Sequence, residues 1–104
     1  MTDPQESDEL LAKLNRETAK IPWEELQRFY AQGAVLEVSP KLDLVAVAAG
    51  MANDDTQTIS PLLASGQLGR VDNESAQKWT QEQASLWAVV VAPWVLVQTH
   101  RDLD

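Results

Sequence analysis

The stretch "LWAVVVAPWVLVQ", residues 86–98, carries no charged side chain and is the most apolar part of the chain. Its apolar run covers the 12 residues 86–97, whereas a membrane-spanning helix needs about 20. The run contains five valines, which favour a strand, and Pro93 would break a helix at this point. The stretch therefore predicts strand structure in the core of a soluble domain.

Pro93 divides this stretch in two. One straight strand of 12 residues would be about 40 Å long at about 3.3 Å per residue, which is too long for a small domain. We therefore expect a strand that bends or bulges at Ala92–Pro93, or two short strands that are joined there. In a regular strand Trp87 and Trp94 would lie on opposite faces, whereas a bulge would place them on the same face.

The stretch does not alternate between apolar and polar residues, so both of its faces need cover. A chain of 104 residues has limited helix to supply that cover. We therefore expect a second copy of the protein to cover the surplus apolar face. The predicted homodimer has Trp87, Pro93 and Trp94 at its interface, because tryptophan is enriched in protein interfaces.

Length and composition predict one domain. Sixteen acidic and eight scattered basic residues give a net charge of −8, which opposes binding to nucleic acid or to anionic lipid. The N-terminal residues form neither the basic nor the apolar region of a secretory signal, and the chain has no cysteine, so we expect a cytoplasmic protein. We place a disordered start at residues 1–6, the domain at residues 7–99 and a polar tail at residues 100–104.

Hydrophobic spacing and breaker residues predict an α+β domain with the order α-α-β-α-α-β-α-β. Its small sheet of three to four strands is packed by helices. Pro22 should end the first helix and push Ile21 towards an extended conformation. The expected helices begin near Ser7 and cover 22–32, 42–53, 61–65 and 74–84, and the expected strands cover 34–38, 68–71 and the opening stretch.

The core is predicted from the inner faces of these elements. We expect Trp23, Leu26, Phe29 and Trp79 to be buried together with most of Val89–Val91.

Three segments, "ETAKIPWEELQRFYAQGAV", "LDLVAVAAGMANDD" and "SLWAVVVAPWVLVQ", resemble a bacterial domain family of about one hundred residues, known as conserved hypothetical proteins. The resemblance extends from about Leu10 to Gln98. It implies a cytoplasmic bacterial protein, and it carries no catalytic residue over to this chain.

The sequence contains no recognisable catalytic constellation. His100 is the only histidine and lies in the polar tail, and the glycines form no phosphate-binding loop. The segment "ISPLLASGQLGRVD" imitates a winged helix, but its helix offers no basic side chain for a DNA groove. We therefore predict neither a catalytic residue, nor a cofactor, nor a nucleic-acid partner.

Four carboxylates remain as candidate ligands. Asp54 and Asp55 are adjacent and could bind a divalent cation, although a helix end followed by a cap for the next segment, through Asp55 or Thr56, explains them better. Glu37 interrupts an apolar strand, from which we expect it to face solvent, and Asp43 follows nearby. Two hypotheses result: a non-catalytic association protein, which we favour, or an enzyme or ligand-binding domain with an acidic pocket near Glu37, Asp43, Asp54 and Asp55.

Overall fold

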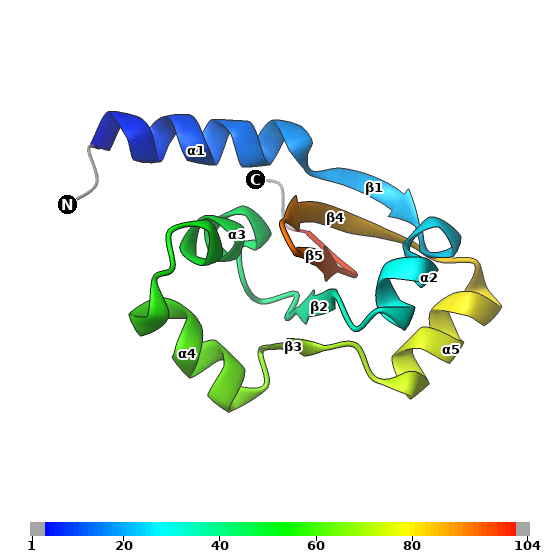
Figure 1. Cartoon of the computed structure of the whole chain (residues 1–104). Helices are drawn as coiled ribbons and strands as arrows, with labels where there is room; N and C mark the ends of the chain where they lie inside the picture. The colour runs from blue at the N-terminus through cyan, green and yellow to red at the C-terminus, as the bar shows by residue number, and fades with distance from the viewer. Residues whose placement is uncertain (1–3, 102–104) are drawn as a thin grey trace.

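The computed structural model describes residues 4–101 and is built around a five-stranded sheet (Figure 1). The predicted α+β class is confirmed, and the sheet has one strand more than the upper limit that we expected. The elements in chain order are α1 (Pro4–Glu17), β1 (Ala19–Pro22), α2 (Trp23–Ala31), β2 (Val35–Val38), α3 (Leu44–Ala52), α4 (Thr56–Ser65), β3 (Leu68–Arg70), α5 (Asn73–Glu82), β4 (Ser85–Val91) and β5 (Trp94–Gln98).

The opening stretch forms two short strands, which is one of the two predicted alternatives. β4 and β5 pair antiparallel, and Val91 lies opposite Trp94 across a turn at Ala92–Pro93 that contains a cis peptide bond. The turn also determines on which face of the sheet the two tryptophans lie. Trp87 and Trp94 both pack against the same core cluster, so they lie on one face of the sheet.

The strand order is β1-β4-β5-β2-β3, in which only the β2–β5 pair is parallel. β5 is the central strand, and its Leu96 and Val97 are fully buried on opposite faces. This position explains why the strand contains no polar alternation. β1 and β3, at the two edges, are only four and three residues long.

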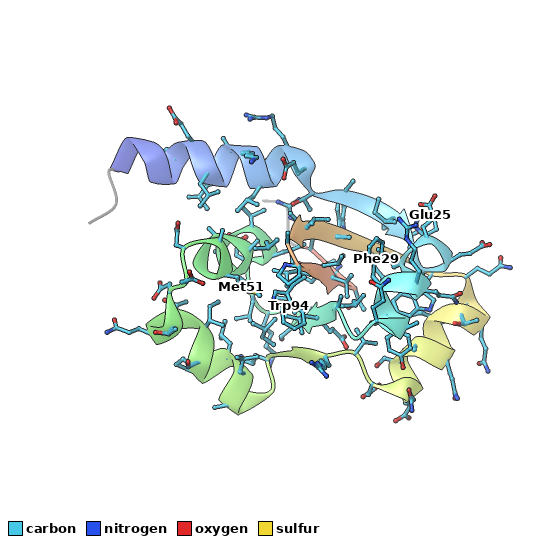
Figure 2. The ribbon with its side chains drawn as sticks, in the orientation of Figure 1. Glu25, Phe29, Met51 and Trp94 are labelled. Atoms are coloured by element: carbon cyan, nitrogen blue, oxygen red, sulfur yellow. The ribbon has the colours of Figure 1, made fainter. Side chains whose placement is uncertain are left out.

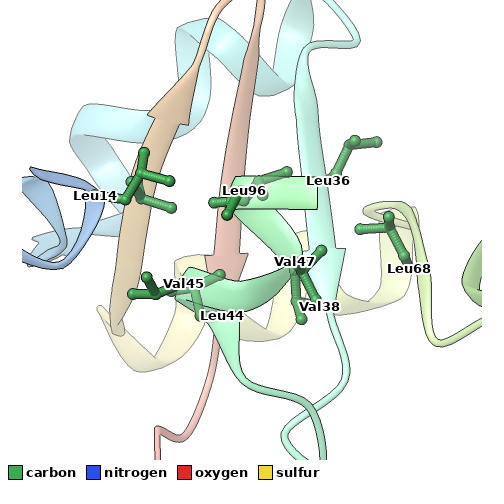
Figure 3. Packing of buried hydrophobic residues seen from close by; sticks show 11 residues of the cluster. Leu14, Leu36, Val38, Leu44, Val45, Val47, Leu68 and Leu96 are labelled. Carbon is green, nitrogen blue, oxygen red and sulfur yellow. The ribbon is translucent and has the colours of Figure 1, made fainter. Parts of the chain in front are cut away.

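Helices α1, α3 and α4 cover the first face of the sheet. Leu14 of α1 and five residues of α3 pack against Leu96 and Val89, and Figure 3 shows this cluster from close by. Asp43 caps α3 by accepting hydrogen bonds from the backbone N–H groups of Val45 and Ala46. The buried members of the cluster are Leu14, Leu36, Val38, Leu44, Val45, Val47, Ala48, Ala49, Leu68, Val89 and Leu96.

Helices α2 and α5 cover much of the second face. The rings of Trp23 and Trp79 meet edge to face with centroids 5.0 Å apart, and the Trp23 indole N–H donates to the Thr80 hydroxyl. The buried members of this second cluster are Trp23, Leu26, Val35, Val71, Ala76, Trp79, Leu86, Ala88, Val95 and Val97.

The predicted single core was therefore partly wrong. Trp23, Leu26 and Trp79 are buried together with Phe29 packed against them, as expected. Val89 and Val91, however, belong to the cluster on the other face, and Val90 is exposed. The cause is the alternation of side chains along a strand, which cannot place three consecutive residues in one layer.

β1 was not predicted, because Ile21 continues the helical spacing of Leu10 and Leu14. In the structure α1 ends at Glu17, and the Thr18 hydroxyl donates to the Leu14 carbonyl at 2.7 Å. Ile21 is extended, as its position before a proline requires, and pairs with Leu86 of β4.

The observed ends of the other helices differ less from the predicted ones. α4 begins at Thr56 and not near Pro61, because Asp55 caps it through the Thr58 N–H, and Pro61 lies inside the helix. α1 begins at Pro4, so Ser7 lies within it and is not its cap. The predicted disordered start and polar tail fall partly on residues 1–3 and 102–104, outside the described residues. Within residues 4–101, no helix is long and apolar enough to cross a membrane.

Candidate functional site

The second face of the sheet carries an apolar groove that the helices leave open. Its floor is formed by β4 and β5, and its sides by β1 and α2. We call it the Val90 groove; its volume is about 610 Å³. The residues that line it are Glu17, Ile21, Glu24, Glu25, Leu26, Arg28, Phe29, Ala88, Val89, Val90 and Val95.

Val90 is the most exposed apolar residue in this groove. Its side chain is 60% exposed, whereas Ala88 and Val95, also on the floor, are buried. The groove remains open because α2 has only nine residues and packs with α5 through Trp23 and Trp79. No helix extends from this pair over Val90.

The rim of the Val90 groove is mainly acidic. Glu17 ends α1, and Glu24 and Glu25 stand in the first turn of α2, where negative charge is favourable. Arg28 is the one basic residue in the lining, and its guanidinium lies over the Phe29 ring at 4.7 Å from the centroid. Figure 2 labels Glu25 and Phe29, which mark this site beside α2.

A second hollow lies on the first face, between α3, α4 and the β4–β5 turn. Its volume is about 300 Å³. It brings Pro93 and Trp94, two predicted interface residues, next to Asp54 and Asp55, two predicted ligands. Figure 2 labels Met51 and Trp94, which lie in this hollow.

The two predicted interface tryptophans are not freely exposed. Trp94 is partly buried against the first cluster. Trp87 is also partly buried, and its ring has the Lys20 ammonium at 5.9 Å and the Arg101 guanidinium at 5.6 Å from its centroid. Arg101 also donates to the Asn15 side chain of α1, so this part of the predicted tail packs onto the domain.

Glu37 lies in a third, small hollow of about 180 Å³ between β2, β3 and the start of α5. The side chain is half-buried, contrary to the solvent-facing position that we expected. Burial raises the pKa of Glu37, and the nearby Asp72 carboxylate raises it further. The pKa of Asp72 is lowered, because Asp72 accepts hydrogen bonds from the backbone N–H and the side chain of Ser75.

The four candidate carboxylates therefore occupy separate places. Glu37 stands beside Asp72, Asp54 and Asp55 border the second hollow, and Asp43 lines neither of these sites. Asp43 and Asp55 both cap helices through backbone N–H groups. Within residues 4–101, no cluster of three or more acidic or histidine side chains could hold a metal ion.

Comparison with known proteins identifies the family. Residues 9–99 match the model of a family described as "Protein of unknown function (DUF2288)". The chain belongs to this family. The resemblance to a family of hypothetical proteins, which the three quoted segments indicated, is thereby confirmed.

The fold of this DUF2288 chain is similar to a solved structure, the NMR solution structure of PA1075 from Pseudomonas aeruginosa. The TM-score is 0.77 and the sequence identity 42%, over 98% of this chain and 94% of that chain. Among curated proteins, none is similar to the chain.

The Val90 groove was missed by the sequence analysis of this DUF2288 chain. Val89, Val90 and Val91 are chemically identical, and their exposure depends on which layer each faces and on where a helix ends. The alternation of side chains along β4 is a signal in the sequence, but which of these side chains the helices cover depends on tertiary packing.

Proposed function

We propose that this protein is a small non-catalytic association domain and that the Val90 groove is its binding surface. The observation that carries the proposal is the 60% exposure of Val90, whereas the other apolar residues of β4 and β5 are buried or partly buried. Exposed apolar surface that is concave and rimmed by charged residues is typical of protein-binding sites.

The alternative, an enzyme or ligand-binding domain with an acidic pocket, has less support. Such a pocket needs its polar groups to converge. Here Glu37 lies in one hollow, Asp54 and Asp55 border another, and Asp43 lines neither of them. Asp43 and Asp55 also cap helices.

The predicted homodimer interface contained Trp87 and Trp94, which lie on the first face of the sheet, whereas the Val90 groove lies on the second face. For a homodimer we therefore propose a different interface from the one that the sequence suggested. If a second copy is the partner, it must cover the Val90 groove. Sedimentation at micromolar concentration would then show a dimer that the Val90→Asp substitution dissociates.

The association function is tested by quantitative affinity capture from cells that produce the protein. We expect the bound proteins, including any second copy, to be lost with Val90→Asp. The matched control is Leu63→Asp, which places the same charge at another exposed apolar residue, 51% exposed in α4 and bordering the second hollow. Equal capture by both variants and the wild type would contradict the proposal.

A further inference from the structure

The size of the Val90 groove limits what can fill it. A stable dimer interface involves about 20–30 residues on each partner. The groove is lined by 11 residues, and Ile21, Phe29 and Val90 are the apolar residues that it exposes most. A surface of this size matches a short segment with a few apolar side chains better than it matches a second folded domain.

The acidic rim of the groove indicates the sign of the charge that a partner should carry. Three carboxylates, of Glu17, Glu24 and Glu25, face one guanidinium, which already lies over the Phe29 ring. Lys20 of the adjacent strand does not offset them, because its ammonium lies over Trp87, which packs on the other face. Two copies of this acidic rim would repel each other, whereas a basic segment would be attracted.

The sheet edge beside the groove is poorly suited to bind the segment as an added strand. β1 has only four residues, and these include Lys20 and Pro22. Short edge strands with lysine and proline are typical of edges that are protected against pairing. An amphipathic helix needs no free edge, since it places its apolar face in a groove.

From these three observations we propose that the Val90 groove binds a short amphipathic helix with a basic polar face. Its apolar side chains contact Val90, Ile21 and Phe29, and its Lys or Arg side chains meet Glu24 and Glu25. This inference rests on the proposed association function and names the chemistry of the partner.

Two synthetic helical peptides of about 15 residues test it. Both have leucine along one face; one has lysine on the polar face, and the other has glutamate at the same positions. Binding to the whole protein is followed by NMR chemical shifts, with Ala88 and Val90 as reporters. We expect the lysine peptide to bind at least roughly ten-fold more tightly at low salt, and this preference to shrink as salt screens the charges.

Variants separate the groove from the overall charge of the protein. Glu24→Lys with Glu25→Lys should reverse the preference between the two peptides. Glu74→Lys with Glu82→Lys makes the same charge change on α5 and should leave the preference as it is. Val90→Asp should weaken binding of both peptides.

Three results would overturn the inference, and they are distinguishable. Equal binding of both peptides at the groove would leave the association function standing and refute the basic partner. A dimer that Val90→Asp dissociates would identify a second copy as the occupant. Absence of shifts at Ala88 and Val90 with both peptides, together with unchanged affinity capture for Val90→Asp, would refute the association function as well.

Discussion

Val89 and Val90 are adjacent in β4 and differ completely in environment: Val89 is 1% exposed in the first core cluster, whereas Val90 is 60% exposed on the opposite face. The difference arises because successive side chains of a strand point to opposite faces. Only the face that bears Val89 has a helix over this part of the strand. The proposed binding surface exists because α2 and α5 stop short of Val90.

The two valines should therefore respond differently to the same substitution. Val89→Thr should lower the free energy of unfolding by about 1–3 kcal/mol, because it buries a hydroxyl among apolar side chains. Val90→Thr keeps the β-branched shape at an exposed position, so it should change the free energy of unfolding by about 0.5 kcal/mol or less. Urea denaturation of both variants measures the two values. Similar large losses in both would mean that Val90 is covered in solution.

Trp79 should be among the most costly residues to truncate. It is 5% exposed, and its ring packs edge to face on Trp23. Trp79→Ala should lower the free energy of unfolding by about 3–5 kcal/mol, as a large-to-small change in a packed core. Trp87→Ala is the matched control and should cost less, because Trp87 is partly buried. A Trp79→Ala variant as stable as the wild type in urea would show that α5 is misplaced.

Asp43 and Asp55 should behave as helix caps. Alanine at either position should lower the free energy of unfolding by about 1 kcal/mol, whereas asparagine, which accepts the same hydrogen bonds, should cost only a few tenths. Thermal unfolding compares the four variants. Adding Mg²⁺ or Ca²⁺ separates capping from metal binding: a melting temperature that rises with the cation in the wild type, and not in the asparagine variants, would contradict the capping role.

The pKa of Glu37 should depend on Asp72. Burial and the Asp72 carboxylate both raise it. Asp72→Asn removes the charge and keeps a good cap for α5, so the pKa of Glu37 should fall towards its ordinary range without reaching it, because the burial remains. NMR titration of the Glu37 side chain measures this shift. An unchanged pKa would show that the two carboxyl groups do not interact.

The same group predicts how stability varies with pH. The folded state holds the Glu37 proton more tightly than the unfolded chain does. The contribution of Glu37 to the free energy of unfolding therefore falls as the pH rises from about 4.3, the ordinary glutamate pKa, through the raised pKa of the folded state. Glu37→Gln should remove this fall, so the variant should gain stability relative to the wild type above the window. A constant difference between the two proteins across the window would contradict this origin.

Parts of the fold could be predicted because local signals agreed with the tertiary structure. Helical spacing of apolar residues indicated α3, through Leu44, Val47 and Ala48. In the structure Asp43, the residue before them, caps this helix. β1 was missed because Ile21 continued the helical spacing of α1, and only the proline after it indicated an extended residue. Pairing with β4, a contact between distant segments, decided its conformation.

The candidate site was harder to predict for the same reason. The sequence correctly indicated that the opening stretch needs cover on both faces, but it could not show how far each helix extends over the sheet. Trp87 and Trp94 attracted attention as interface residues, whereas their own chain partly buries them. Val90 is the same residue type as its two neighbours, so nothing in the sequence distinguished it. Its exposure follows from the alternation of side chains along β4 and from where a helix elsewhere in the chain ends.

The central claim, that Val90 marks the association surface, is tested most directly by site-specific photocrosslinking in cells that produce the protein. A photoreactive phenylalanine derivative replaces Val90 in one variant and Leu63, the exposed leucine of α4, in the other. We predict that irradiation converts the position-90 variant into adducts of defined higher mass and leaves the position-63 variant without them. Absence of adducts at position 90, or the same adducts from both positions, would contradict the claim.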